Sequence, residues 1–254
     1  MQIICKEKIF TINHVWFENI EKIEKGYDKI KINGLAKSLE KIDRTKCFSS
    51  VQETLISDLS IEKEKLWGKL TKTVRNEINR SKRENIEIQF FYPNMITNKL
   101  LDEFESMYVG MFESKGIHHK GLSRNVLRSY IQNQALFMSV AYIDSKPVVY
   151  HSYVCDKIHV RLLHSCSEFR EADNLERNKI GRANKFLHWN DWIQLKDIGV
   201  TEYDWGGISS YSSPNGIDKF KMSFGGEYRK YFNVFAICSK KAKIQYYIKN
   251  WLKR

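Results

Sequence analysis

The chain has 254 residues and a formal net charge of +12, from 42 lysines and arginines against 30 aspartates and glutamates. No apolar run approaches the ~18 to 20 residues that a membrane-spanning helix needs, and the N-terminus lacks a signal-peptide pattern. We therefore expect a cytoplasmic protein, with the inner face of the membrane as an alternative location. The five cysteines are irregularly spaced, so neither a disulfide framework nor a CxxC motif is indicated. The positive charge favours anionic partners: coenzyme A, a nucleotide- or lipid-linked sugar, tRNA or a membrane surface.

The first 60 residues mix short apolar runs with many lysines, and strands are predicted at 9–17 and 54–59. From Ser60 a helix is predicted, because its apolar residues recur at helical spacing. That stripe consists of Trp67, Leu70, Val74 and Ile78. The opposite face is basic, and Lys72, Arg75 and Lys82 are its candidate phosphate-binding residues. A solvated charged surface is the alternative interpretation of this face.

The remainder of the chain alternates strand and helix patterns. In order these are a strand at 86–92, helices at 97–115 and from 123, strands at 135–143, 147–155 and 157–166, a helix from Gly181 that ends at Gly199, a strand at 202–205 and a helix at 217–224. His188 and Asp191 are expected to lie away from the apolar stripe of the helix that follows Gly181. The pattern predicts an α/β (α+β type) fold with a mixed, mostly antiparallel sheet flanked by helices. We divide it into an N-terminal strand and helix extension, 1–85, and a main domain, 86–254.

Three stretches carry a resemblance to a known family. GRANKFLHW, YDWGGI and GIDKFKMSFGGE resemble the C-terminal half of the Fem-type aminoacyl transferases and the wider FemAB-like branch of the GNAT acyltransferases. The segment DLSIEKEKLWGKLTKTVRNEINRSKRENIEI resembles the helix and strand that precede that half. The resemblance covers about residues 55 to 235. It departs in one respect, since Fem-type enzymes usually carry two GNAT-like halves and a helical arm, and this chain has room for one full half.

The resemblance implies a GNAT-like domain and an acyl donor. GNAT enzymes bind the coenzyme A pyrophosphate in a Q/R-x-x-G-x-G/A turn at a helix N-terminus, where free N–H groups and the helix dipole favour anions. The matching residues are Asn178, Gly181 and Ala183, with Arg182 beside them and Asn in place of the usual Gln or Arg. A coenzyme A thioester is therefore the expected co-substrate, aminoacyl-tRNA is the alternative donor, and no metal is expected.

Acyl transfer to an amine needs a group that accepts the ammonium proton and donors for the oxyanion. Asp204, at the end of a predicted strand, is the candidate base, with Glu202 on the same strand face. Acceptor binding and capping of the following loop are the alternative roles of Asp204. The resemblance implies that Lys221 handles charge at the reacting ester, and an exposed surface lysine is the alternative. Substrate contacts are expected from Gly206, Gly207 and Phe220.

Three functions remain open at this point. The first is an N-acyltransferase that moves an acyl group from a thioester to an amine of an amino sugar or cell-envelope precursor, in polysaccharide or cell-envelope biosynthesis. The second uses aminoacyl-tRNA as the donor, in the manner of a peptide-bridge aminoacyltransferase. The third is a non-catalytic, basic RNA- or membrane-binding module. Residues 239–254 are basic, contain no acid and carry an apolar face, so they predict either peripheral membrane contact or a helix docked on the domain.

Overall fold

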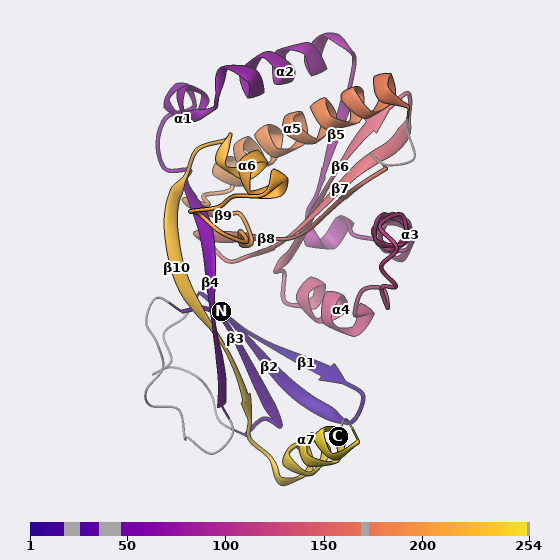
Figure 1. Ribbon diagram of the computed structural model, residues 1–254, viewed down its shortest axis with the longest axis vertical. Coiled ribbons are helices and arrows are strands. Elements are labelled where there is room, and N and C mark those ends of the chain that lie inside the picture. Colours follow the sequence, from indigo (N-terminus) through magenta and orange to yellow (C-terminus); the bar gives the residue numbers. More distant parts are fainter. Residues whose placement is uncertain (18–25, 36–46, 169–172, 253–254) are drawn as a thin grey trace.

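A computed structural model describes residues 1–17, 26–35, 47–168 and 173–252. Their strands form one ten-stranded sheet in the order β1-β2-β3-β10-β4-β9-β8-β7-β6-β5 (Figure 1). The strands are β1 Gln2–Glu7, β2 Phe10–Trp16, β3 Lys29–Leu35, β4 Cys47–Asp58, β5 Glu87–Phe91, β6 Leu136–Ile143, β7 Lys146–Cys155, β8 His159–Ser167, β9 Glu202–Asp204 and β10 Glu227–Ile237. The helices are α1 Lys63–Lys69, α2 Lys72–Arg83, the 3₁₀ turn η2 Pro93–Met95, α3 Asn98–Glu113, α4 Arg124–Gln132, α5 Asn174–Asp197, α6 Gly216–Met222 and α7 Lys240–Trp251.

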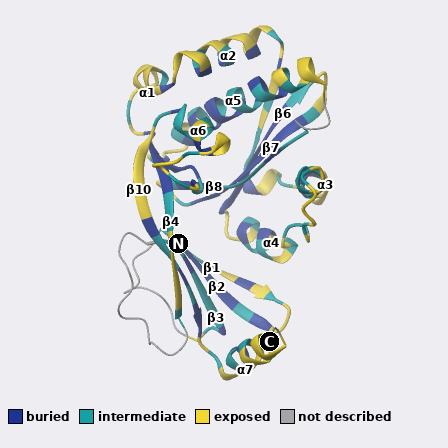
Figure 2. Cartoon of the chain, in the orientation of Figure 1, coloured by how far each residue is buried: buried dark blue, intermediate teal, exposed yellow. Residues whose placement is uncertain are grey.

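The predicted fold class is confirmed. Only the β2–β3 and β8–β9 pairs of the sheet are parallel, and the other named pairs are antiparallel. Figure 1 shows α2 and α5 on one side of the sheet and α3 and α4 on the other. The helix α5 joins the parallel strands β8 and β9, as a crossover between parallel neighbours requires. Helices thus cover both faces of the sheet around β6, β7 and β8 (Figure 2).

The sheet runs across the boundary placed at residue 85. β4, from the N-terminal side, lies between β9 and β10, both from the C-terminal side. Ile56 of β4 pairs with Asp204 on one edge and with Glu227 on the other. The core on the α5 side therefore combines Leu55, Leu66, Val74, Trp192 and Phe224. The division into an extension and a main domain stays a prediction about sequence, and the two parts share this core.

The basic helix predicted from Ser60 is divided into α1 and α2. Leu70, at the junction, has an extended backbone, and Thr71 caps α2 by accepting a hydrogen bond from Val74 N. The Thr71 N–H donates to Ser223 O at the end of α6, which ties the junction to the rest of the domain. The predicted stripe survives the break, because Leu70, Val74 and Ile78 are buried.

The start of α5 corrects a second prediction. The helix begins at Asn174, seven residues before Gly181, because Asp173 caps it by accepting hydrogen bonds from Leu175 N and Glu176 N. The predicted end is confirmed: Gly199 follows the helix with a φ of +94°, a conformation that glycine adopts at low cost.

Candidate active site

The parallel strands β8 and β9 diverge after a short contact. They pair only from His159 opposite Glu202 to Arg161 opposite Asp204, while β8 continues to Ser167. A register shift against β7 places one extra residue, Leu163, in β8 just beyond this contact. Within the described residues, no strand pairs with this edge of β8 from Leu162 onward. The strand therefore presents a bulged and unpaired edge beside the end of β9.

The glycine pair after β9, Gly206 and Gly207, lies close to the point where β8 and β9 stop pairing. Gly206 has a φ of +79°, and a Cβ there would lie 2.2 Å from the carbonyl oxygen of Leu162. Gly207 has a φ of +102°, and a Cβ there would lie 2.1 Å from Nε2 of Gln52. Both positions favour glycine for its positive φ, and at Gly206 the close approach to a backbone oxygen requires glycine as well, whereas Gln52 Nε2 ends a flexible side chain. The predicted contact of this backbone with substrate stays a prediction.

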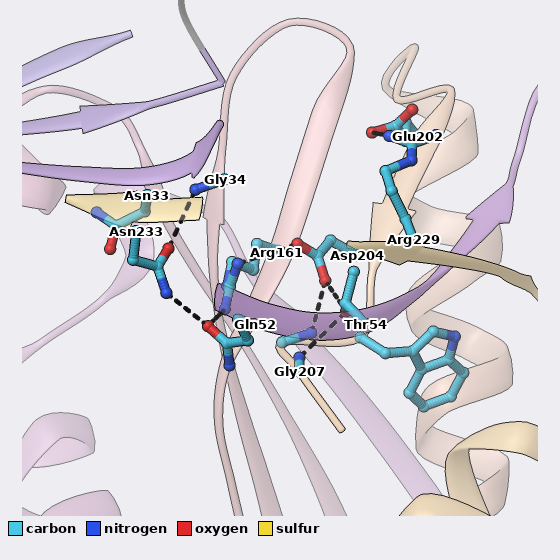
Figure 3. Close-up of polar contacts among 12 residues, drawn as sticks. Asn33, Gly34, Gln52, Thr54, Arg161, Glu202, Asp204, Gly207, Arg229 and Asn233 are labelled. Carbon is cyan, nitrogen blue, oxygen red and sulfur yellow. Dashed lines mark hydrogen bonds and ion pairs between the residues drawn. The ribbon is translucent and has the colours of Figure 1, made fainter. Parts of the chain in front are cut away.

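Asp204 is surrounded by donors (Figure 3). Its carboxylate accepts hydrogen bonds from Thr54 Oγ1 at 2.5 Å, from Gly206 N at 2.9 Å and from Arg161 Nη1 at 3.1 Å. The residue is 7% exposed. Three donors from β4, β8 and the loop after β9 thus occupy most of the acceptor positions of this buried carboxylate. Of its two alternative roles, the contacts of Asp204 favour the capping of the loop after β9.

The contacts of Asp204 extend away from β9. Arg161 Nη2 and Asn233 Nδ2 both donate to Gln52 Oε1, and Asn233 Oδ1 accepts from Gly34 N, so the chain of polar contacts reaches β3 (Figure 3). Glu202 does not join this chain. It pairs with Arg229 of β10 at 2.8 Å, in a half-exposed position. Asp204 and Glu202 were predicted to share a strand face, and they take part in two separate ion pairs.

Lys221 is held inside the loop that follows β9. Its Nζ donates to Trp205 O at 2.8 Å and to Gly207 O at 2.6 Å. The helix that carries it is fixed by a capping box between Asn215 and Asp218. Burial is the main reason that the pKa of Lys221 is lowered to about 8. Near neutral pH the ammonium form predominates, and two of its three protons are used by the loop.

The lysine lies in an aromatic environment. The rings of Phe220 and Phe224 are 5.4 Å apart, and His188 of α5 lies 5.6 Å from Phe220 and 4.8 Å from Trp205. Lys185 Nζ lies 5.5 Å from the Phe220 ring. Phe220 is thus a packing neighbour of the lysines and of α5, and its contact with a substrate stays a prediction.

The predicted pyrophosphate turn does not lie at a helix N-terminus. Asn178, Gly181, Arg182 and Ala183 all lie within α5. Ala183 is fully buried, and Arg182 donates to both carboxylate oxygens of Glu84 at 2.8 Å. These helical N–H groups lie beyond the first turn, so they are not the free donors that an anion site requires. The geometric basis of this cofactor prediction was wrong, because Asp173 starts the helix earlier.

The basic face of α1 and α2 is partly engaged. Arg75 donates to the carbonyl oxygens of Leu70 and Gly68 and so caps the end of α1. Lys82 lies over the Trp67 ring at 5.6 Å, and Lys72 is exposed. Lys82 and Trp67 line a surface hollow of about 380 Å³ together with Lys63, Glu64, Asn79 and Trp189. Phosphate binding by Lys72, Arg75 and Lys82 stays a prediction.

A buried polar cluster under α5 was not predicted from the sequence. His151 Nδ1 lies 2.8 Å from Asp191 Oδ2, Tyr153 OH donates to the same oxygen at 2.5 Å, and His151 Nε2 lies 2.9 Å from Asn184 Oδ1. His188 stacks on His151 with ring centroids 4.0 Å apart. Burial, with His151 next, lowers the pKa of His188 well below its usual value, so His188 is neutral.

The sequence contains a signal for this cluster. Asn184, His188 and Asp191 are spaced by four and three residues, which places them on one face of a helix. His151 and Tyr153 are two apart on one strand, and therefore share a face. His188 and Asp191, which were expected to lie away from the apolar stripe of this helix, are both buried, 1% and 0% exposed. The helix α5 lies between the sheet and α2, so these two positions are buried as well.

His151, His188 and Asp191 offer ligand atoms that lie within 4.8 Å of one another. A metal ion requires lone pairs that converge on one point. The rings of His151 and His188 are stacked at an interplanar angle of 29°, so their in-plane lone pairs lie in nearly parallel planes, and His151 Nδ1 is already engaged with Asp191. The cluster therefore fits a hydrogen-bond network better than a metal site.

The chain shares its fold with several solved structures, although its sequence is only 10–13% identical to them. No family model and no curated protein matches this sequence. Among solved structures, the chain is similar to the C-terminal domain of a protein assigned as a lysylphosphatidylglycerol synthetase from Agrobacterium fabrum, with a TM-score of 0.59 at 13% identity over 96% of this chain and 82% of that one. It is also similar to FemX, with a TM-score of 0.58 at 10% identity over 96% of this chain and 85% of that one. L-PGS from Bacillus licheniformis gives a TM-score of 0.52 at 13% identity over 85% of this chain and 70% of that one.

Proposed function

We propose that this protein is an acyltransferase that moves an acyl group onto an amine at the opening between β8 and β9. The observation that carries the proposal is the unpaired edge of β8 beyond Arg161, beside a partly buried lysine. An unpaired strand edge offers backbone donors and acceptors to an extended donor molecule. In this proposal the acyl chain or its carrier lies along Leu162–Ser167 and the reacting carbonyl faces Lys221.

Lys221 is proposed to stabilise the oxyanion that develops as the amine attacks. The new C–N bond forms, the bond from carbonyl carbon to the donor's sulfur or oxygen breaks, and the amine loses one proton. Two Lys221 protons hold the carbonyls of Trp205 and Gly207, which leaves the third for the reacting oxygen. A fixed ammonium in a partly buried site stabilises such charge more strongly than a hydrated one does. The capping contacts of Asp204 make water the proposed acceptor of the amine proton.

Of the two donors, aminoacyl-tRNA is favoured over a coenzyme A thioester. Asp173 occupies the N–H groups of Leu175 and Glu176 at the start of α5, and Glu176 adds a second negative charge there. Both features oppose a pyrophosphate at this helix end. A donor carried by tRNA needs no such site, because its phosphates would contact the surface of a chain with a net charge of +12.

The proposed acceptor is an amine on a cell-envelope precursor, such as an amino sugar or a lipid-linked intermediate. Two structural similarities support this class of acceptor. The name of one protein, lysylphosphatidylglycerol synthetase, refers to an amino acid joined to a membrane lipid, and the other, FemX, belongs to the Fem-type group that the sequence resembles. Neither similarity exceeds 13% identity, so each supports the class of acceptor and no particular compound.

The donor is tested by binding to the whole chain. We expect aminoacyl-tRNA to bind with an affinity that falls steeply between 50 and 200 mM salt, roughly 10-fold or more for a few phosphate contacts. Free coenzyme A should leave the melting temperature unchanged. A rise in melting temperature with coenzyme A, together with no binding of tRNA, would replace this donor with the thioester. No binding of either would remove the support for donor chemistry at this site.

A further inference from the structure

The C-terminal helix α7 exposes an apolar stripe to solvent. Five apolar residues recur at a spacing of three and four along it, which places them on one side of the helix. Their exposed fractions are Ile244 59%, Tyr247 55%, Ile248 53%, Trp251 75% and Leu252 71%. We call these five residues the α7 stripe. Figure 2 shows α7 largely exposed at one end of the molecule, beside β1, β2 and β3.

The opposite side of α7 is the one that docks on the sheet. Ala242 is fully buried against Phe10, Ile12 and Ile237, and Tyr246 packs on the same cluster. Lys29 Nζ donates to Gln245 Oε1 at 2.9 Å. The sequence predicted either docking or membrane contact for this helix. The structure separates the two, because docking uses Ala242 and Tyr246, whereas each residue of the α7 stripe is more than half exposed.

The helix α7 places lysines within and beside the α7 stripe and carries no acid of its own. Successive residues of a helix are rotated by 100°, so Lys240 falls within the angular range of the stripe, Lys243 lies on one flank and Lys241 lies near the other edge. From Ser239 to Leu252 the chain contains no aspartate or glutamate. Lys241 also anchors the helix, since its Nζ lies 2.8 Å from Asp28 Oδ2 and 2.9 Å from Ile9 O.

A second element continues the surface. Ile9, at the tip of the β1–β2 hairpin, is 73% exposed, and its carbonyl oxygen is the one that Lys241 contacts. Lys8 precedes it in the same turn. Two segments far apart in sequence therefore place exposed apolar side chains and lysines at the same end of the molecule, where Figure 1 shows α7 close to the β1–β2 turn.

We propose that the α7 stripe and Ile9 bind the surface of an anionic lipid bilayer, with α7 lying parallel to the membrane. Among the described residues, no helix is both long and apolar enough to cross a membrane, so the contact is peripheral. Apolar side chains enter the acyl boundary, and lysines beside them pair with anionic headgroups. The inference goes beyond the proposed transferase activity, because this surface includes no residue of the β8–β9 site.

The chemistry of the surface selects lipid over the other partners. Single-stranded RNA binding uses stacked aromatics within a basic groove, whereas three of the five residues of the stripe are aliphatic. A second copy of the chain would place the flanking lysines of both copies together, which is unfavourable without acids to pair them. A bilayer that contains phosphatidylglycerol matches both the apolar and the basic parts.

The test is flotation of the full chain with vesicles. We expect binding to vesicles of phosphatidylcholine with 30% phosphatidylglycerol, weaker binding to pure phosphatidylcholine, and a loss at high salt. Ile248→Glu should reduce partition into the vesicles by about tenfold or more, and Lys240→Gln and Lys243→Gln by about fivefold each.

Ile158→Glu is the matched control for the apolar change, because Ile158 is 49% exposed in the turn between β7 and β8, away from α7. Lys249→Gln is the control for charge, since it lies on the side of α7 opposite the stripe.

Trp251 supplies an independent signal. Its indole is 75% exposed, and the fluorescence of the chain should shift to shorter wavelength when vesicles are added. Trp251→Phe should keep most of the binding and lose the shift. Absence of binding to the anionic vesicles would overturn the proposal. So would equal losses for Ile158→Glu and Ile248→Glu, a dimer in sedimentation that Ile248→Glu dissociates, or RNA that binds through the stripe in preference to vesicles.

Discussion

Two buried carboxylates in this molecule have opposite surroundings. Asp204, at the end of β9, is paired with Arg161 and accepts hydrogen bonds from Thr54 and Gly206. Among the described residues, Asp191 of α5 has no arginine or lysine partner: its Oδ2 contacts His151 and Tyr153, and its Oδ1 has no hydrogen-bond partner. The comparison indicates that Asp204 is a structural ion, which fixes the loop beneath Lys221. Asp191 belongs to a buried hydrogen-bond network with two side chains of β7, His151 and Tyr153.

The largest effect on stability is expected at Gly206. In Gly206→Ala the new Cβ would meet the Leu162 carbonyl oxygen at 2.2 Å and the backbone would keep a φ of +79°, so β8 and the loop must separate. We expect a loss of about 4 kcal/mol in the free energy of unfolding, measured by urea denaturation. Gly68→Ala is the control, because nothing lies within 4 Å of its Cβ in α1, and it should stabilise by about 0.5 kcal/mol. Equal stability of the two variants would show that the loop does not depend on this contact.

Breaking the ion pair between Asp204 and Arg161 should lower the free energy of unfolding somewhat less than Gly206→Ala does. Asp204→Asn leaves Arg161 buried without a counter-ion, and we expect a loss of about 3 kcal/mol. Arg161→Met alone should cost a similar amount. The double variant should recover part of the loss, because it leaves neither charge unpaired. Simple addition of the two single effects would argue against a coupled pair and against the structural role of Asp204.

Asp191→Asn should have a smaller effect, about 1 kcal/mol, since an amide oxygen still accepts from Tyr153 and no arginine is left unpaired. Urea denaturation of this variant beside Asp204→Asn sharpens the comparison between the two carboxylates. A loss for Asp191→Asn as large as that for Asp204→Asn would mean that Asp191 balances a positive charge on its neighbours.

A dependence of stability on pH is expected at Lys221. Its pKa is about 8 in the folded protein, below the usual 10.5, so the folded state binds fewer protons than the unfolded state between these values. The cost of the buried ammonium is fully present below pH 8 and is relieved as pH rises from 8 to 10.5. Relative to Lys221→Met, wild type should therefore gain about 1 to 2 kcal/mol from pH 7 to pH 10, after allowance for solvent screening. A difference that is constant with pH would contradict burial of the charge.

Periodicity predicted most of the elements, and their local signals explain why. Alternation at 135–143 and 147–155 and the apolar positions of α3 are recovered almost residue for residue. The start of α5 was missed because the helical spacing of apolar residues begins near Gly181, whereas the helix start is set by the cap at Asp173. The strand β3 was missed because lysines alternate with its isoleucines, and β1 was missed because its apolar run is only three residues long.

The arrangement of the candidate site could be predicted only in part. The resemblance identified Lys221 and the glycine pair, and the structure places them in one loop. The partners of Asp204 come from β4 and β8, 150 and 43 residues away in sequence, and local patterns carry no information on such contacts. The pairing of β4 between β9 and β10 is equally non-local, and it decides which side chains surround the site.

The central claim is that Lys221 promotes acyl transfer beside the open edge of β8. The most direct measurement follows the labelled acyl group from aminoacyl-tRNA, and in parallel from acyl-coenzyme A, to hydroxylamine as a small amine acceptor. We expect wild type to form the hydroxamate, Lys221→Met to be slower by roughly 100-fold, and Lys221→Arg to recover only part of the rate. Lys219→Met, an exposed lysine on the same helix, should match wild type. Equal rates for wild type and Lys221→Met, or no hydroxamate from either donor, would contradict the account.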